Sequence, residues 1–293
     1  MVETNEKKLN EVLEIPRTPK PKIEIESVSR IFHSNNANRR ACGDYTALAN
    51  VSLNVQPGEF VALLGPSGCG KSTLLDMLTG LSFPTSGSIR IDGKPVDGPS
   101  LDRGIILQGY TLLPWRTVRK NVEFGLEVKK IARKDYRDIS DSYLRLVGLS
   151  EFANRYPHEL SGGMKQRVAI ARALAFNPEI LLMDEPFGAL DAQTSELLQD
   201  ELLRIWEAKR KTIVFVTHSI DEAVFLADRV VVMSASPGRI LEVVKIDLPR
   251  PRQDSDVRLT PEFGRIRHRV WELLHQHSSH AAQHSEATLQ YAR

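Results

Sequence analysis

The chain has 293 residues, of which 41% are hydrophobic and 26% charged, so it can bury a large core and is neither collagen-like nor wholly disordered. Its 39 basic and 37 acidic residues give a formal net charge of +2, which is too balanced for a chain whose main task is to cover a nucleic-acid backbone. Only Cys42 and Cys69 are cysteines, and the apolar runs are far shorter than the roughly 18 residues of a membrane span, so we expect a reducing, cytosolic setting.

The first part of the chain is predicted to be an arm followed by two half-buried strands. Residues 1–22 are polar and contain three prolines, which favours a mobile arm. Ile23–Val28 and Leu48–Val55 alternate apolar and polar residues, as strands with one buried face do. The polar stretch between them indicates a loop or an extended hairpin tip.

The middle of the chain is dominated by short runs that are apolar on both faces. Such runs are typical of parallel strands covered on both sides, so we expect an α/β fold. The pattern stops between Thr117 and Leu160, where amphipathic helices indicate a helical subdomain inserted between two parts of the sheet. The predicted buried strands are Phe60–Leu64, Ile180–Met183, Ile213–Val216 and Val230–Met233.

The C-terminal residues 249–293 are predicted to form an extension of a main domain of residues 23–248. Leu248–Arg252 is rich in proline and arginine and indicates an extended linker. Pro261–Leu274 spaces its apolar residues three or four apart, as an amphipathic helix does. The last residues, from His275 on, are polar and are expected to fray.

A phosphate-binding loop is predicted at Gly65–Ser72, which fits G-x-x-x-x-G-K-[ST] at every fixed position between a predicted strand and a predicted helix. The glycines let backbone N–H groups turn toward an anion, and the helix adds its positive end. Lys71 is expected to neutralise the β- and γ-phosphates of ATP, and the Ser72 hydroxyl to bind Mg²⁺. The residues predicted to contact the nucleotide here are Gly65, Pro66, Ser67, Gly68, Cys69, Gly70, Lys71, Ser72 and Thr73.

Two acidic residues follow the apolar run Ile180–Met183. We expect Asp184 to hold Mg²⁺ through water, and Glu185 to accept a proton from, or to orient, the water that attacks the γ-phosphate. Acidic residues are common at strand ends, so the prediction becomes specific only in combination with Lys71.

A second anion site is predicted at the start of another helix. Leu160–Arg167 places Ser161 before Gly162 and Gly163, so that a hydroxyl and backbone N–H groups converge at a helix N-terminus. Taken alone, the same residues are typical of an ordinary serine N-cap. A single active site needs one phosphate cradle, whereas this chain has two.

Over about residues 23–248 the chain resembles the ATP-binding-cassette (ABC) ATPases, whose signature LSGGQ corresponds to Leu160–Met164, with Met164 in the last place. The resemblance implies a P-loop (RecA-like) core with an antiparallel β subdomain and an inserted α-helical subdomain. It also implies that two cassettes pair head to tail, so that Ser161, Gly162 and Gly163 of one close over ATP held by the Lys71 loop of the other. The motifs that carry it, besides the phosphate loop and the signature, are Gln108, Asp184–Glu185, Gly188–Asp191 and His218.

The resemblance also implies roles for single residues. Gln108 would contact Mg²⁺ and the attacking water and sense the membrane partner, His218 would hydrogen-bond the γ-phosphate, and Asp191 would link the two sites across the dimer. The implied catalytic residues are therefore Lys71, Gln108, Glu185 and His218, and the implied metal ligands are Ser72, Gln108 and Asp184.

An aromatic side chain upstream of the phosphate loop stacks on adenine in members of the family. Phe32, which follows the first predicted strand, matches that place. Tyr45 is the competitor because the loop before it could fold back. We favour Phe32, and either ring offers a flat face for stacking.

Three further segments are similar to the importer ATPases of the nitrate, sulfonate and taurine group: Gly109–Val118, Ser236–Ile240 and Leu248–Arg252. In that group the surface around Tyr110–Trp115 helps to receive a coupling helix of the permease. Trp115 could instead pack under the helical subdomain.

The hypothesis that follows is an ATPase subunit of an importer for a small anion or sulfonate. Its implied partners are a second cassette, the transmembrane permease and, indirectly, an extracytoplasmic solute-binding protein, with no nucleic acid. Its implied location is the cytoplasmic face of the inner membrane. A non-transport cassette of the translation or DNA-repair type is the alternative.

Overall fold

The computed structural model describes residues 20–33, 44–107, 109, 111–188, 190–253 and 256–290, with side chains as far as His275. Most of the predicted arm, Cys42, Gln108 and Tyr110 lie outside the described residues. With η for short 3₁₀ helices, the elements in chain order are β1 (Ile23–Phe32), β2 (Tyr45–Val55), β3 (Phe60–Leu64), α2 (Lys71–Thr79), β4 (Ser86–Ile91), β5 (Lys94–Pro95), β6 (Arg103–Ile106), α3 (Val118–Val128), η1 (Arg133–Asp135), α4 (Tyr136–Leu146), η2 (Ser150–Phe152), η3 (Pro157–Glu159), α5 (Gly162–Ala175), β7 (Ile180–Asp184), α6 (Ala192–Lys209), β8 (Thr212–Thr217), α7 (Ile220–Leu226), β9 (Arg229–Met233), β10 (Ile240–Lys245), η4 (Val257–Leu259) and α8 (Pro261–Gln290).

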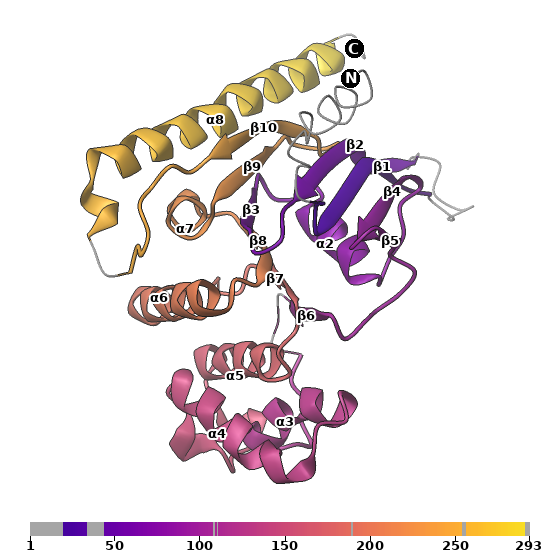
Figure 1. Cartoon of the computed structure of the whole chain (residues 1–293). Coiled ribbons are helices and arrows are strands. Elements are labelled where there is room, and N and C mark those ends of the chain that lie inside the picture. Colours follow the sequence, from indigo (N-terminus) through magenta and orange to yellow (C-terminus); the bar gives the residue numbers. More distant parts are fainter. Residues whose placement is uncertain are drawn as a thin grey trace, which may run out of the picture.

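A six-stranded sheet in the order β10-β9-β3-β8-β7-β6 runs through the centre of the molecule (Figure 1). The strands from β9 to β6 are parallel, and β10 pairs antiparallel with β9. A second sheet, in the order β2-β1-β4-β5, is antiparallel. The predicted α/β core with an antiparallel β subdomain is confirmed.

The central strands are apolar on both sides because each face of the sheet has its own core. Along β3, Phe60, Ala62 and Leu64 share a cluster with residues of α5, α6 and α7. Val61 and Leu63 belong to a second cluster with α2 and the antiparallel sheet. A strand covered in this way needs apolar residues at consecutive positions, which is the pattern that made it recognisable in the sequence.

Helices α3, α4 and α5 form the lower end of the molecule (Figure 1). Thr117 caps α3 by accepting a hydrogen bond from the Lys120 backbone N–H at 3.3 Å. Helix α5 packs on both α3 and α4, because its apolar residues, such as Val168, share one core with theirs. The helical subdomain therefore extends to Ala175, beyond the predicted end at Leu160.

In the segment Leu248–Arg252, which was predicted to be an extended linker and forms no helix or strand, Leu248 and Arg252 are buried, whereas Pro249 and Pro251 are exposed. Arg252 is 1% exposed. Its guanidinium donates to the carbonyl oxygens of Phe225 and Ala227 at 2.9 and 2.8 Å and to two further carbonyls, and its burial lowers its pKa to about 10. The charged group therefore closes the carboxyl end of α7, where backbone carbonyls lack partners within the helix.

Helix α8 begins at Pro261 as predicted but continues to Gln290, past the expected end at Leu274. The stretch after Leu274 contains neither Gly nor Pro, so nothing in it stops the helix. Val270 and Leu273 are buried where α8 packs against α7, β9 and β10. Among the described residues, no helix is both long enough and apolar enough to cross a membrane.

We expect Arg252→Ala to lower the free energy of unfolding by roughly 2–4 kcal/mol, because buried carbonyls of α7 lose their donor. Urea unfolding followed by circular dichroism measures the effect. The control is Arg239→Ala at an exposed position, which should change stability by less than about 0.5 kcal/mol. A loss no larger than that of the control would show that the arginine does not hold the C-terminal segment in place.

Candidate nucleotide site

The predicted phosphate loop joins the buried strand β3 to α2. Gly68 and Gly70 have φ angles of 77° and 90°, in the left-handed region that favours glycine. A Cβ at Gly70 would also lie 2.6 Å from Leu48 Cδ2 and 2.8 Å from the Ala47 carbonyl oxygen. The loop therefore packs directly against β2, and glycine is required at this position.

Lys71 is 6% exposed, and its ammonium group lies inside the loop. Nζ donates to the carbonyl oxygens of Gly65 and Pro66 at 2.8 and 2.9 Å and lies 3.6 Å from Cys69 Sγ. The charge is thus placed at the centre of the loop, where a phosphate would compete with the carbonyls for it.

Strand β7 ends at Asp184, which is 7% exposed. Burial raises the pKa of its carboxyl group, as do the charges of Glu185 and Asp76, whereas a hydrogen bond with Ser72 and the charge of Lys71 lower it. Its Oδ1 atom is buried without a hydrogen-bond partner in the described part of the chain. A carboxylate oxygen left unpaired beside a hydroxyl suits a hard divalent cation and its water ligands, so Ser72 and Asp184 fit Mg²⁺.

We expect Asp184→Asn to raise the melting temperature of the nucleotide-free protein and to abolish the further stabilisation by Mg²⁺ with ATP. Because the folded-state pKa is raised, the ionised carboxylate destabilises the fold above that pKa, and the destabilisation disappears as the pH falls through it. Thermal melts at pH 7.5 with and without Mg²⁺ and ATP measure both effects. A lower melting temperature for the variant would contradict the first, and unchanged Mg²⁺-dependent stabilisation the second.

Glu185 and His218 lie next to each other at the carboxyl ends of β7 and β8. Glu185 has a φ of 45°, an uncommon conformation for a residue with a Cβ, and its N–H donates to the Val216 carbonyl at 3.0 Å. His218 Nδ1 lies 3.3 Å from Glu185 Oε2. The fold thus brings together an acid and an imidazole that are 33 positions apart in the sequence.

The loop, Glu185 and His218 all line one cavity of about 470 Å³. Most of its lining was predicted, but Ala47 was not, because only the packing of β2 on the loop places it there. The lining residues are Tyr45, Ala47, Ser67, Gly68, Gly70, Lys71, Ser72, Thr73, Glu185 and His218.

The two aromatic candidates for adenine stacking are paired across β1 and β2. Phe32 and Tyr45 are 44% and 47% exposed. Tyr45 lines the cavity and its hydroxyl donates to the Gly68 carbonyl at 3.2 Å, whereas the Arg30 guanidinium lies 4.8 Å from the centre of the Phe32 ring. Phe32 as the stacking residue stays a prediction.

The predicted signature residues Ser161, Gly162 and Gly163 do not line this cavity, and neither does Asp191. Within one chain, Ser161 and Asp191 are N-caps: Ser161 Oγ accepts from the Met164 N–H at 3.3 Å, and Asp191 Oδ1 accepts from the Thr194 N–H at 2.9 Å. The latter hydrogen bond lowers the pKa of Asp191. The position of Gln108 lies outside the described residues.

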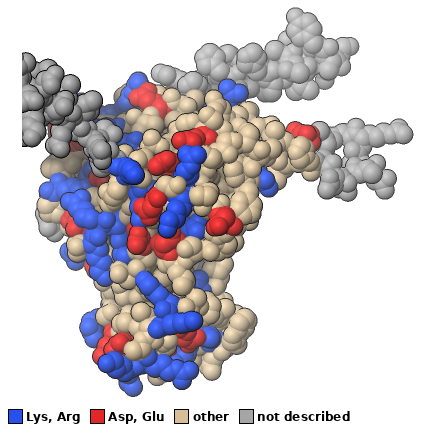
Figure 2. All heavy atoms as spheres, turned by 45° about the vertical axis from the view of Figure 1, so that its right-hand side comes forward, with Lys and Arg blue, Asp and Glu red and all other residues tan. Residues whose placement is uncertain are grey.

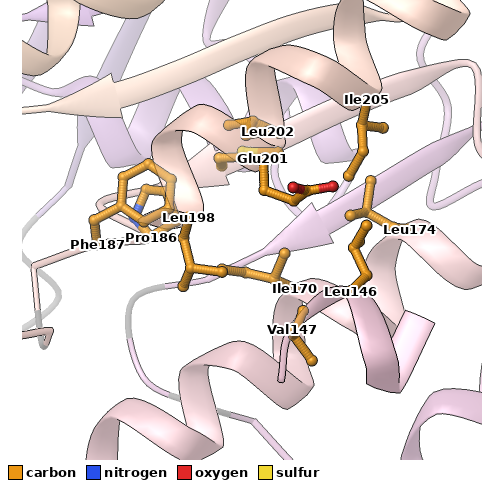
Figure 3. Close-up of a pocket in the computed structure, with 11 residues that line it drawn as sticks. Leu146, Val147, Ile170, Leu174, Pro186, Phe187, Leu198, Glu201, Leu202 and Ile205 are labelled. Carbon is orange, nitrogen blue, oxygen red and sulfur yellow. The ribbon is translucent and has the colours of Figure 1, made fainter. Parts of the chain in front are cut away.

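An apolar crevice, which the sequence analysis did not predict, lies between the helical subdomain and α6 (Figure 3). Pro186 and Phe187, on its wall, directly follow Glu185, and α5, on the opposite side, begins just after Ser161. The crevice therefore joins the segment of the acidic pair to the helix of the second anion site. Its lining is Leu146, Val147, Ile170, Leu174, Met183, Pro186, Phe187, Leu198, Glu201, Leu202 and Ile205.

Comparison with known proteins decides the family. The sequence model of the ABC transporter family matches residues 48–188. An uncharacterized ABC transporter ATP-binding protein of Methanocaldococcus jannaschii is 53% identical over 255 residues, which are 87% of this chain and 92% of that protein. The chain belongs to the ABC transporter family. This cassette is also 47% identical, over 241 residues, to the nitrate import ATP-binding protein NrtD of Synechococcus elongatus, with 81% of this chain and 88% of that protein covered.

The cassette is also similar to solved structures. The dimeric structure of MJ0796, a bacterial ABC transporter cassette, has a TM-score of 0.70 and 35% identity, with 78% of this chain and all of that chain covered. A dimeric post-hydrolysis state of MJ0796, bound to ADP and Pi, has a TM-score of 0.68 and 34% identity. The predicted ABC ATPase fold and ATPase activity are confirmed. The ADP-bound neighbour also supports nucleotide binding by this chain.

Proposed function

We propose that this ABC ATPase is the ATP-hydrolysing subunit of an importer for a small anion of the nitrate, sulfonate or taurine class. The observation that carries the proposal is the 47% identity to a nitrate import ATP-binding protein over more than four fifths of both chains. ATP binding would close two cassettes and switch the permease, and hydrolysis would reset it.

The two cassettes would pair head to tail. Lys71 of one chain neutralises the β- and γ-phosphates, and the turn Ser161–Gly163 of the other covers them. Two observations support this arrangement: the cavity of one chain contains no residue of that turn, and the similar MJ0796 cassette is dimeric. Asp191, at the N-terminus of α6, would link the two sites.

Hydrolysis would depend on the residues at the carboxyl ends of the central strands. Ser72, Asp184 and Gln108 would hold Mg²⁺, which supplies positive charge to the phosphates. Glu185 would orient or deprotonate the attacking water, and the neighbouring His218 would hydrogen-bond the γ-phosphate. The 3.3 Å contact between the last two residues supports their acting on the same group.

The permease would dock near Trp115. This side chain is 72% exposed, so it does not pack under the helical subdomain. Large exposed aromatic residues are enriched at protein interfaces, which supports a coupling-helix contact. Docking would hold the cassette at the cytoplasmic face of the inner membrane, and an extracytoplasmic binding protein would deliver the solute to the permease.

Adenine stacking is tested by single variants at both aromatic positions. We expect Phe32→Ala to weaken ATP binding roughly 5–30-fold, since one base–aromatic contact contributes about 1–2 kcal/mol. Tyr45→Phe keeps the ring and removes the hydroxyl bonded to Gly68, so its affinity should stay within about 2-fold. Titration with a fluorescent ATP analogue measures both, and a larger loss for Tyr45→Ala than for Phe32→Ala would reassign the stacking residue.

Co-purification from cells tests the function directly. We expect the tagged chain to co-purify with a membrane permease, and the reconstituted complex to hydrolyse ATP faster when nitrate, taurine or another small anion and its binding protein are supplied. Co-purification with ribosomes or DNA instead, without a permease, would favour the non-transport alternative.

A further inference from the structure

A cleft of about 780 Å³ lies in the helical subdomain, between α3 and the segment η1–α4. It shares no lining residue with the ATP cavity. Figure 2 shows Lys and Arg side chains, with a few Asp and Glu among them, gathered at the lower end of the molecule. The cleft is lined by Arg119, Lys120, Glu123, Glu127, Lys130, Ile131, Arg133, Tyr136 and Arg137.

The acidic groups in and beside this cleft are already paired. Glu123, 3% exposed, accepts from Lys120 Nζ at 2.6 Å, and Glu127 accepts from Arg116 Nη1 at 2.8 Å. Asp141, on α4, accepts from Arg119 Nη1 at 2.5 Å. These three pairs engage the acidic groups of the cleft lining, and Asp135 and Asp138 are the further acidic residues of the η1–α4 segment.

Three exposed cations of the cleft are left over: Lys130, Arg133 and Arg137. In the described structure Lys130 and Arg133 form no ion pair, and Arg137 lies 3.8 Å from an Asp141 carboxylate that Arg119 already engages. Residues 116–141 contain eight Lys or Arg and five Asp or Glu, so this one segment has an excess of three positive charges in a chain of net charge +2. The excess charge of the protein is therefore concentrated here.

We propose that this cleft binds a phosphate-bearing anion. Two guanidinium groups offer the planar pairs of N–H donors that match phosphate oxygens, and Lys130 adds a compact charge. Helix α4 begins at the cleft with Tyr136, but Asp135 and Asp138 at this helix end offset the positive end of its dipole, so the binding rests on the three side chains. The shared chemistry is that of a phosphate ester or polyphosphate, whether as a soluble anion or as the headgroup of an acidic lipid.

The test uses the full chain saturated with Mg²⁺ and ADP, so that the phosphate loop is occupied. One arm titrates inorganic pyrophosphate by calorimetry, and the other measures flotation with phosphatidylglycerol vesicles against phosphatidylcholine vesicles. Binding in the first arm identifies a soluble anion, and selective binding in the second a lipid headgroup; either supports the proposal.

Three variants assign the binding to the cleft. We expect K130Q/R133Q/R137Q to bind pyrophosphate or phosphatidylglycerol vesicles, whichever the wild-type chain binds, roughly 10–100-fold more weakly. The charge-matched control K94Q/R145Q/R239Q, at exposed positions elsewhere, should stay within about 2-fold. The charge-preserving K130R/R133K/R137K, which keeps the charge but only one guanidinium, should bind more weakly than the wild type and more tightly than K130Q/R133Q/R137Q. The proposal is overturned if the wild-type chain binds in neither arm, or if the cleft variant binds as well as the control. Basal ATPase activity of all three variants should be unchanged, which separates this outcome from a failure of the proposed transport function.

Discussion

Glu185→Gln is expected to bind ATP with nearly wild-type affinity and to hydrolyse it at least ~10²-fold more slowly, by analogy with the loss of one transition-state contact. The amide keeps the size and the acceptor oxygen of the side chain but cannot take a proton from water. Since Glu185 is held at a φ of 45° by its N–H bond to Val216, the variant should keep the geometry of the site.

Phosphate release in single-turnover experiments, together with equilibrium ATP binding, measures the two parts of this expectation. Glu151→Gln is the matched control, because it makes the same chemical change at an exposed position on η2. Wild-type turnover in Glu185→Gln would refute the assigned role. A large loss of ATP affinity would mean that the acid acts in binding.

Lys71→Ala is expected to weaken ATP binding roughly 10–100-fold, because a charge-assisted contact to the phosphates contributes about 1.5–3 kcal/mol. The loss of ATP affinity should be smaller than for a lysine without intramolecular hydrogen bonds, because Nζ must first give up its bonds to the carbonyls of Gly65 and Pro66 at 2.8 and 2.9 Å. The variant also leaves those carbonyls without this donor, so its melting temperature should be lower.

Calorimetric titration with Mg²⁺ and ATP measures the affinity, and Lys94→Ala, an exposed lysine of β5, is the control. Unchanged ATP binding in Lys71→Ala would discredit the phosphate-loop assignment. The two variants separate binding from chemistry, because one should lose affinity and the other only turnover.

The parts of the fold that the sequence predicted well are those where one local rule applies. The limits of β3 were predicted at Phe60 and Leu64 because both of its faces are buried and a turn and a glycine loop bound it. The phosphate-loop motif and the acidic pair could be recognised because their chemistry fixes both residue types and spacing, and their roles stay predictions.

The sequence was less informative where residues apart in the chain decide the structure. Leu248–Arg252 has the composition of a linker, but Arg252 is buried because carbonyl oxygens at the carboxyl end of α7, 25 to 28 residues earlier in the chain, accept hydrogen bonds from it. Likewise, Ala47 lines the ATP cavity only because β2 packs on the loop. No pattern within either segment contains that information.

The head-to-tail dimer is tested most directly by the structure of Glu185→Gln trapped with Mg²⁺ and ATP. We expect Ser161 Oγ of one chain to lie about 3 Å from a γ-phosphate oxygen whose other oxygens are bound by Lys71 of its mate. A complex in which the signature turn is remote from both nucleotides, and one chain alone surrounds each ATP, would contradict the account.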